Sequence, residues 1–254
     1  MRILVTNDDG IHAPGLQVCA DIAHALSDDV WVVAPEVDNS GVSHSLSLND
    51  PLRLRHVSER VYAVKGTPTD CVIMAARHIL KDQPPDLVLS GVNRGSNLGE
   101  DVTYSGTVAG AMEGTVLGIP SFALSQSYGP GRRDNPFWDC ARKHAPDVVR
   151  RILEAGIPND VLVNVNFPDC APADVQGIAV SSQGKRDQEM LRIDARFDGR
   201  GNPYYWLAYT RSGVQSTRAG TDLVAVAQKK IAVTPLRLDL TDEPFMTKLA
   251  EVFG

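Results

Sequence analysis

The sequence has no run of lysine or arginine residues, and its 254 residues carry a formal net charge of −6. A surface that binds a nucleic-acid polymer or an anionic membrane needs clustered positive charge, so we expect neither as the main partner of this protein. An acidic protein can still bind a phosphate group. It then needs a metal ion or exposed backbone N–H groups to supply positive charge locally.

Cysteine is also scarce, and no two of the four cysteines form a C-x-x-C pair. Cys19 and Cys71 fall within apolar helical patterns, where a cysteine usually acts as a small buried hydrophobic residue. The spacing therefore argues against a zinc knuckle and against a disulfide framework. Histidine gives no zinc signal either, because His12 has no partner at H-x-x-x-H or H-E-x-x-H spacing.

Long apolar runs are missing as well. The N-terminal run that includes Ile3-Leu4-Val5 is too short for the core of a signal peptide, and no later stretch is long enough to cross a bilayer. We therefore expect a cytoplasmic protein. The chain shows no internal repeat, and 43% hydrophobic with 22% charged residues is ordinary for a globular protein.

Short apolar runs rich in β-branched residues alternate with helical patterns, which predicts an α/β fold with a parallel sheet covered by helices. The expected strands are 3–5, 30–33, 52–55, 61–64, 87–89, 121–124, 161–165 and 231–235. The expected helices are 14–26, one beginning at Thr67, 105–117, 221–228 and 244–253.

Beyond residue 182 the composition changes. Asp198-Gly199-Arg200-Gly201-Asn202 is typical of a hairpin turn, and an aromatic strand pattern with Tyr204, Tyr205 and Trp206 follows it. A two-stranded ribbon cannot bury such aromatic side chains by itself, so we predict an arm that packs on another subunit. A hairpin folded back on its own core is the alternative.

Two adjacent carboxylates, Asp8 and Asp9, directly follow the first expected strand. In open parallel sheets, ligands bind beyond the carboxyl ends of the strands. Adjacent carboxylates repel each other unless a cation compensates, and Mg²⁺ or Mn²⁺ can do so with oxygen ligands. The alternative is an Asx turn followed by a helix cap, with Gly10 in the left-handed conformation.

Two further loops are expected to leave the same edge of the sheet: Asp38–Gly41 after the second core strand and Ser90–Asn97 after the third. Neutral oxygens from Ser40 and Asn93 would complete a shell for a hard metal ion, with room for water and a phosphate. This convergence favours the metal site over the turn.

The segment Tyr104–Gly110 opens an expected helix. Its exposed N–H groups, the positive end of the helix dipole and the hydroxyls of Ser105 and Thr107 suit an anion. A plain N-cap, with Gly110 admitting close helix–sheet packing, is the alternative.

These motifs form an ordered set that spans nearly the whole chain. The set comprises Met1–Gly10 with Ala13-Pro14-Gly15, Asn39-Ser40-Gly41, Gly66–Cys71, Ser90–Asn97, Tyr104–Val108 and Thr234-Pro235-Leu236. It resembles the SurE survival-protein family of nucleotidases, most densely over residues 1–125 and least clearly over 183–209.

The resemblance implies a Rossmann-like fold, with a mostly parallel sheet, helices on both faces and a C-terminal β-hairpin arm that builds a homodimer or homotetramer. It implies one divalent metal ion per subunit, Mg²⁺ or Mn²⁺, and hydrolysis of nucleoside 5′- and 3′-monophosphates. We assign residues 1–182 to the catalytic core and 183–254 to a C-terminal extension, the two forming one structural unit. Carried over residue by residue, the metal ligands fall on Asp8, Asp9, Ser40 and Asn93, and the phosphate contacts on Asn97, Ser105, Gly106 and Thr107.

The expected mechanism is in-line attack by a metal-activated water that Asp8 or Asp9 orients or deprotonates. An aspartyl-phosphate route is disfavoured, because phosphatases of that kind carry D-x-D-x-T where this chain has Gly10 and Ile11 after Asp9. Two alternatives without turnover stay open: a receiver-like, Mg²⁺-dependent phosphate switch and a nucleotide-binding module. Stable labelling by acetyl phosphate would identify the first, and the absence of phosphate release with Mn²⁺ would identify the second.

Overall fold

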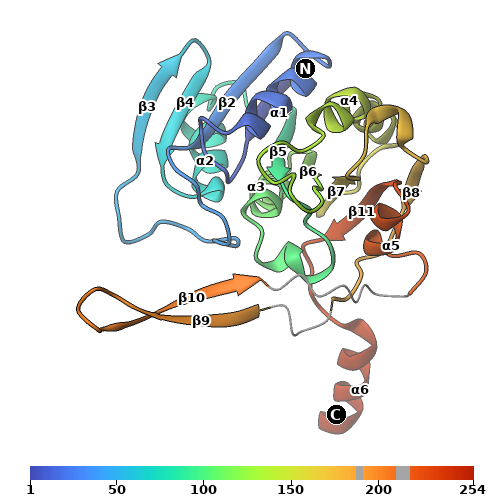
Figure 1. Cartoon of the computed structure of the whole chain (residues 1–254). Coiled ribbons are helices and arrows are strands. Elements are labelled where there is room, and N and C mark those ends of the chain that lie inside the picture. The colour runs from blue at the N-terminus through green and yellow to red at the C-terminus, as the bar shows by residue number, and fades with distance from the viewer. Residues whose placement is uncertain (187–190, 210–217) are drawn as a thin grey trace.

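The computed structural model describes residues 1–186, 191–209 and 218–254. Nine strands in this part of the chain form one mixed sheet in the order β3-β4-β2-β1-β5-β6-β7-β11-β8 (Figure 1). From β4 to β7 the strands of this order run parallel, β3 and β11 are antiparallel to β4 and β7, and β8 is parallel to β11. The bounds are β1 (Arg2–Thr6), β2 (Asp29–Pro35), β3 (Arg53–Ser58), β4 (Val61–Lys65), β5 (Leu87–Arg94), β6 (Ser121–Gln126), β7 (Val161–Phe167), β8 (Ile178–Val180) and β11 (Ile231–Arg237).

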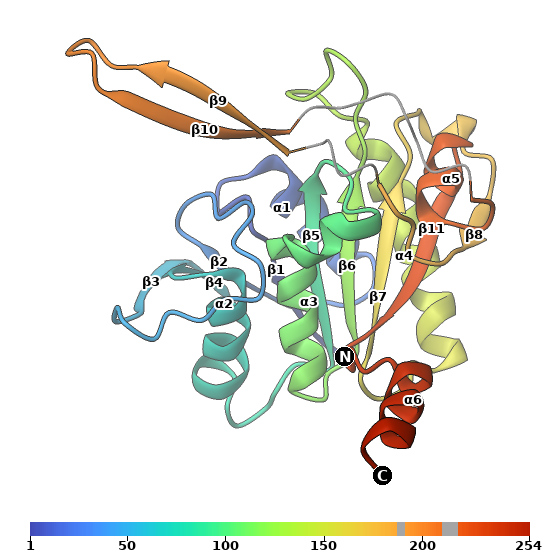
Figure 2. The same ribbon diagram turned by 90° about the horizontal axis from the view of Figure 1, so that it is seen from below.

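Helices cover both faces of this sheet (Figures 1 and 2). On one face α1 (Pro14–His24) and α4 (Trp138–Ala155) pack on β1, β5 and β6, with Ile3 and Val5 in their shared core. On the other, α2 (Pro68–Met74) packs over Leu4 and α3 (Gly106–Val116) over β5 to β7. The remaining helices are α5 (Asp222–Ala227), which packs on β11, α6 (Glu243–Phe253) and the short turns η1 (Ala75–Ile79), η2 (Gly99–Thr103) and η3 (Pro172–Asp174). The predicted fold class, a mostly parallel sheet with helices on both faces, is confirmed.

Local sequence signals explain where the helices begin. Pro14 occupies the first turn of α1, where its missing N–H costs nothing. The predicted capping box starts α2: the Thr67 hydroxyl accepts a hydrogen bond from Asp70 N, and the Asp70 carboxylate accepts one from Thr67 N. The helix α3 begins after Ser105, whose Oγ accepts a bond from Val108 N at 3.0 Å.

Some elements differ from the expectation, among them β8, which is not one of the expected strands. Residues 138–155 lie outside the expected helices but form α4; no capping side chain marks its start at Phe137, and Pro146 lies inside it. The expected loop from Ser90 is also wrong in its first half, because β5 continues to Arg94 and pairs again with β6 at Asn93 and Ser125. Gly91 permits this close approach, since a Cβ at this position would lie 2.3 Å from the Leu124 carbonyl oxygen.

The predicted hairpin is formed by β9 (Leu191–Phe197) and β10 (Pro203–Tyr209), which pair antiparallel as a separate sheet. Its turn is closed by Asp198, whose Oδ1 accepts bonds from Arg200 N and Asn202 N. The hairpin extends away from the main sheet in both views (Figures 1 and 2), with Tyr205 64% and Trp206 58% exposed. The alternative of a hairpin folded on its own core is therefore wrong.

Other apolar surface lies on α6, which exposes Phe245, Met246, Val252 and Phe253. None of the helices within the described ranges has the length and apolar character that a bilayer span requires.

We expect the β9–β10 arm to pack on a second copy of the chain, because exposed aromatic residues on a two-stranded ribbon are typical interface anchors. Truncating the exposed Trp206 to alanine should weaken self-association about 30-fold or more. Sedimentation velocity across a concentration series measures this shift toward smaller species, and Arg200→Ala in the turn is the control. A Trp206→Ala protein that stays fully assembled at low micromolar concentration would contradict the interface.

Candidate active site

The strand order changes direction beside β1. From β1 the chain crosses to β2 and then β4 on one side, and later returns to β5 on the other. Ligands of doubly wound sheets bind at the carboxyl ends of the strands at such a switch point. Asp8 and Asp9 follow β1, the loop with Ser40 follows β2, and Asn93 lies near the end of β5. The loop after β2 is tied to this edge by a hydrogen bond from Asn39 N to the Asp8 carbonyl oxygen at 2.8 Å.

Asp8 is buried against the first turn of α3. Only 4% of the residue is exposed, and the Thr107 hydroxyl donates a hydrogen bond to its Oδ1. The backbone of α3 comes this close because residue 106 is a glycine: a Cβ there would lie 2.7 Å from Asp8 Cβ. The structure thus brings two predicted phosphate contacts, Gly106 and Thr107, directly onto a predicted metal ligand.

The site carries negative charge that the protein does not neutralise. Burial raises the pKa of Asp8 to about 7 in concert with the nearby carboxylates of Asp9 and Asp38, although the hydrogen bond from Thr107 opposes the shift. Burial also raises the pKa of Asp9, although Arg94 opposes this by donating its backbone N–H to Asp9 Oδ2 at 3.1 Å and by its charge. Among the described residues, no salt bridge involves Asp8 or Asp9.

The two neutral candidate ligands have different settings. Ser40 is exposed, and its hydroxyl donates to Asp38 Oδ1 at 2.6 Å. Asn93 is half-buried and its Nδ2 donates to the Gly95 carbonyl at 2.9 Å, which leaves its amide oxygen as the potential ligand atom. In the described part of the chain, no group of three or more His, Cys, Asp or Glu side chains is arranged to hold a metal ion. An ion beside Asp8 and Asp9 would therefore need neutral oxygens as well.

The other predicted phosphate contacts are buried. Ser105 is 7% exposed, and its Oγ caps α3. Asn97 is also 7% exposed, and its Nδ2 donates to Ser125 Oγ at 2.9 Å.

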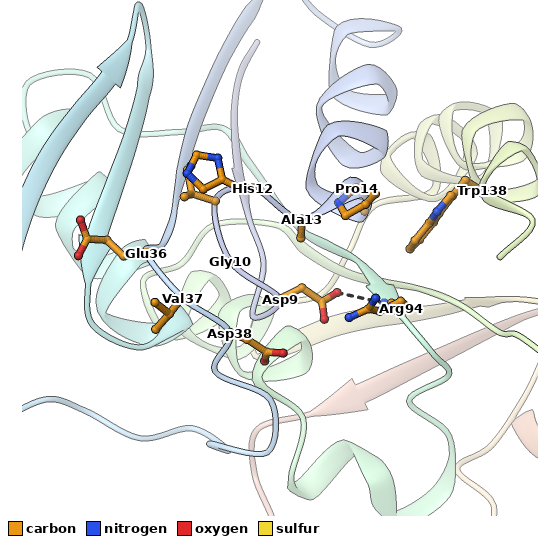
Figure 3. Close-up of a pocket in the computed structure, with 12 residues that line it drawn as sticks. Asp9, Gly10, His12, Ala13, Pro14, Glu36, Val37, Asp38, Arg94 and Trp138 are labelled. Atoms are coloured by element: carbon orange, nitrogen blue, oxygen red, sulfur yellow. Dashed lines mark hydrogen bonds between the residues drawn. The ribbon is translucent and has the colours of Figure 1, made fainter. Parts of the chain in front are cut away.

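A hollow of about 390 Å³ opens beside Asp9 (Figure 3). Asp38 and Arg94 line it, together with His12, Glu36 and Trp138. Arg94 is not among the predicted site residues, and neither is Asp38 as a charge in the site. For Asp38 the signal was its place two residues before Ser40 in the loop after β2, whereas nothing local marks Trp138.

The loop after β5 is held by the C-terminal extension. Asp222, which is fully buried, accepts a hydrogen bond from Gly99 N at 2.9 Å and one from Gly184 N at 2.8 Å. Arg186 bonds the Asp101 carboxylate at 2.7 Å, and its backbone N donates to Glu100 Oε2. Glu100 and Asp101 are thus bound within the protein.

The pKa of Asp8 predicts how the stability of the metal-free protein depends on pH. Because its folded-state pKa is about 7 and its ordinary value is 3.8, the folded state retains a proton that the unfolded state loses between these values. The free energy of unfolding should therefore fall by about 4 kcal/mol from pH 4 to pH 7 through this group and then level off. Chemical denaturation in the presence of a chelator measures it. Asp8→Asn should remove this slope and exceed the wild type in stability at pH 8, whereas the exposed Asp50→Asn should not; an unchanged slope in Asp8→Asn would contradict the assignment.

Comparison with known proteins identifies the family of this chain. Residues 3–190 match the family model described as survival protein SurE. The 5'-nucleotidase SurE of Methylorubrum extorquens (strain PA1) is 68% identical over 253 residues, covering 100% of this chain and 99% of the relative, and that of Methylobacterium radiotolerans is 69% identical over 254 residues, covering 100% of both. The crystal structure of a SurE protein from Aquifex aeolicus matches with a TM-score of 0.85 and 43% identity over 100% of both chains. The chain belongs to the survival protein SurE family.

Proposed function

We propose that this protein hydrolyses nucleoside 5′-monophosphates, and also 3′-monophosphates, to nucleoside and phosphate with a divalent metal ion. The observation that carries the proposal is the buried Asp8 carboxylate, held against the start of α3 beside Asp9 and Asp38 with its charge uncompensated. A cation and a phosphate are the two ligands that such a junction favours.

The reaction class follows from the relatives. The chain aligns over its full length with proteins named 5'-nucleotidase SurE at 68% and 69% identity. It is therefore a phosphoric-ester hydrolase, and its substrate is a nucleoside monophosphate.

The residues fit a hard metal ion. Asp8 and Asp9 offer carboxylate oxygens whose pKa values are raised mainly by burial, so a bound cation would favour their charged forms, and Ser40 and Asn93 offer neutral oxygens from neighbouring strand ends. A Mg²⁺ or Mn²⁺ ion bound by these four residues would neutralise phosphoryl charge and acidify an attacking water.

The protein's own groups then bind and orient the substrate. The N–H groups at the start of α3 face the phosphoryl oxygens and stabilise their charge. Because the Thr107 hydroxyl donates to Asp8, the backbone N–H is the group of Thr107 left for phosphate. Ser105 Oγ accepts the Val108 N–H and keeps its own proton to donate. Asp8 or Asp9 orients the water and takes its proton.

Asp8→Asn and Asp9→Asn should each lower phosphate release from AMP with Mn²⁺ on the order of a thousandfold, because each removes a charge that holds the ion. Circular dichroism should show an intact fold, and calorimetric titration with Mn²⁺ should show the loss of metal affinity. Asp50→Asn should behave as wild type. Retained turnover with unchanged metal affinity in both variants would rule out the metal site.

Ser40→Ala and Asn93→Ala should be milder, since water can replace a neutral ligand. We expect the Mn²⁺ concentration for half-maximal activity to rise about tenfold, with activity largely restored at high Mn²⁺. Ser45→Ala, an exposed serine further along the same loop as Ser40, is the control. If neither variant changes the metal dependence, these two residues do not meet at the ion.

A further inference from the structure

Two asparagines of β7 lie on the face of the strand that α3 covers. Asn164 and Asn166 are both fully buried and alternate with the same period as Leu162, which packs in the apolar cluster of α3 with Val108 and Ala123. A buried amide costs free energy unless it is hydrogen-bonded. The partners of these amides therefore indicate what they do.

Both amides bind the backbone of one residue in the loop after β5. Asn166 Oδ1 accepts a hydrogen bond from Asn97 N at 2.9 Å, and Asn166 Nδ2 donates to the Asn97 carbonyl oxygen at 3.1 Å. Asn164 Nδ2 donates to that same carbonyl at 2.9 Å. The side chain of Asn97 is fixed in turn by its bond to Ser125 Oγ at 2.9 Å.

The Asn166 amide makes the two backbone hydrogen bonds that a neighbouring strand would otherwise make with Asn97. Regular pairing of β5 with β6 ends at Arg94 and Gln126, so the backbone of Asn97 has no strand beside it to bind its N–H and carbonyl. A primary amide supplies one acceptor and one donor on adjacent atoms, which matches these two backbone groups. A carboxylate supplies only acceptors and an aliphatic side chain neither.

We propose that Asn166 is a positioning residue for the phosphate: it fixes the backbone of Asn97, and through it the contact that Asn97 makes with the substrate. Asn164, the neighbouring residue on that face of β7, donates a second hydrogen bond to the Asn97 carbonyl oxygen. The proposal rests on the proposed function, because it takes Asn97 as a phosphate contact. In the described structure the side chain of Asn166 is hydrogen-bonded to the backbone of Asn97 and to none of the candidate metal ligands.

Asn166→Asp tests this with a change of one atom. At pH 8 the introduced carboxylate still accepts the Asn97 N–H but places an oxygen against the Asn97 carbonyl. We expect kcat/KM for AMP to fall about 5- to 150-fold relative to wild type, mainly through KM. Burial raises the pKa of the introduced group, so it gains a proton as the pH falls and its O–H can again donate to the carbonyl. The variant-to-wild-type ratio of kcat/KM should therefore recover toward one at pH 5.5.

Gln126→Glu is the matched control. Gln126 is an equally buried amide at the end of β6, and its Nε2 donates to the Pro168 carbonyl at 2.8 Å while its Oε1 accepts from Ala141 N of α4. The same amide-to-acid change there lowers thermal stability without touching Asn97. The ratio of kcat/KM for Gln126→Glu to that of wild type should not recover at pH 5.5, whereas the ratio for Asn166→Asp should.

Asn166→Ala is a second variant. Amide hydrogen exchange provides a readout that does not depend on turnover. Exchange of the Asn97 N–H should be faster in Asn166→Ala than in wild type, and kcat/KM for AMP should fall without recovery at pH 5.5. Wild-type exchange at Asn97 in both Asn166 variants, or wild-type KM in both, overturns the proposal, as does a pH-independent loss shared with Gln126→Glu. A wild-type protein that releases no phosphate from any nucleotide refutes the proposed function instead, because the exchange result at Asn97 would stand without it.

Discussion

The contact between the Asp8 carboxylate and the first turn of α3 joins the acidic residues and the proposed phosphate-binding helix start in one buried junction. It requires a strand that ends at the switch point of the sheet, a helix whose first residue has no Cβ, and a hydroxyl in its first turn. Gly106 and Thr107 meet the last two requirements. Because a Cβ at residue 106 would lie 2.7 Å from Asp8 Cβ, the positions of β1 and α3 are constrained by this junction.

The interior of the sheet becomes polar toward this junction. Along β7 the face that carries Leu162 continues with Asn164 and Asn166, and in β1, β5 and β6 the apolar runs give way to the buried Thr6, Ser90 and Ser125. In the described structure the hydroxyl oxygens of Thr6 and Ser90 have no hydrogen-bond partner. The rest of the sheet buries apolar side chains, so its core stabilises the fold while its carboxyl edge carries the proposed site.

Features encoded by neighbouring residues could be predicted from the sequence. The Thr67 capping box, the turn closed by Asp198 and the acidic pair after β1 all depend on residues within a few positions of one another. The continuation of β5 past Ser90 could not be predicted, because small polar residues form a strand there only through pairing with β6 at Asn93 and Arg94, which is distant in the sequence. The helix α4 could not be predicted either, because Pro146 lies inside it and an interior proline normally ends a helix. The Asn97–Asn166 contact joins residues 69 apart, and no local pattern reports it.

The stem of the arm has its own consequence. Ser182 and Thr221 form a bridge, Ser182 N donates to the Gly220 carbonyl, and Asp222 N donates to the Ser182 carbonyl, so the chain leaves the core and re-enters it at one place. The β9–β10 hairpin is thus attached to the core like an inserted cassette. During evolution such a cassette can drift in sequence, or exchange one mode of association for another, without disturbing the register of the sheet. Asp222 is not free to change in this way, because the residue that closes the stem also accepts a hydrogen bond from Gly99 N in the loop after β5.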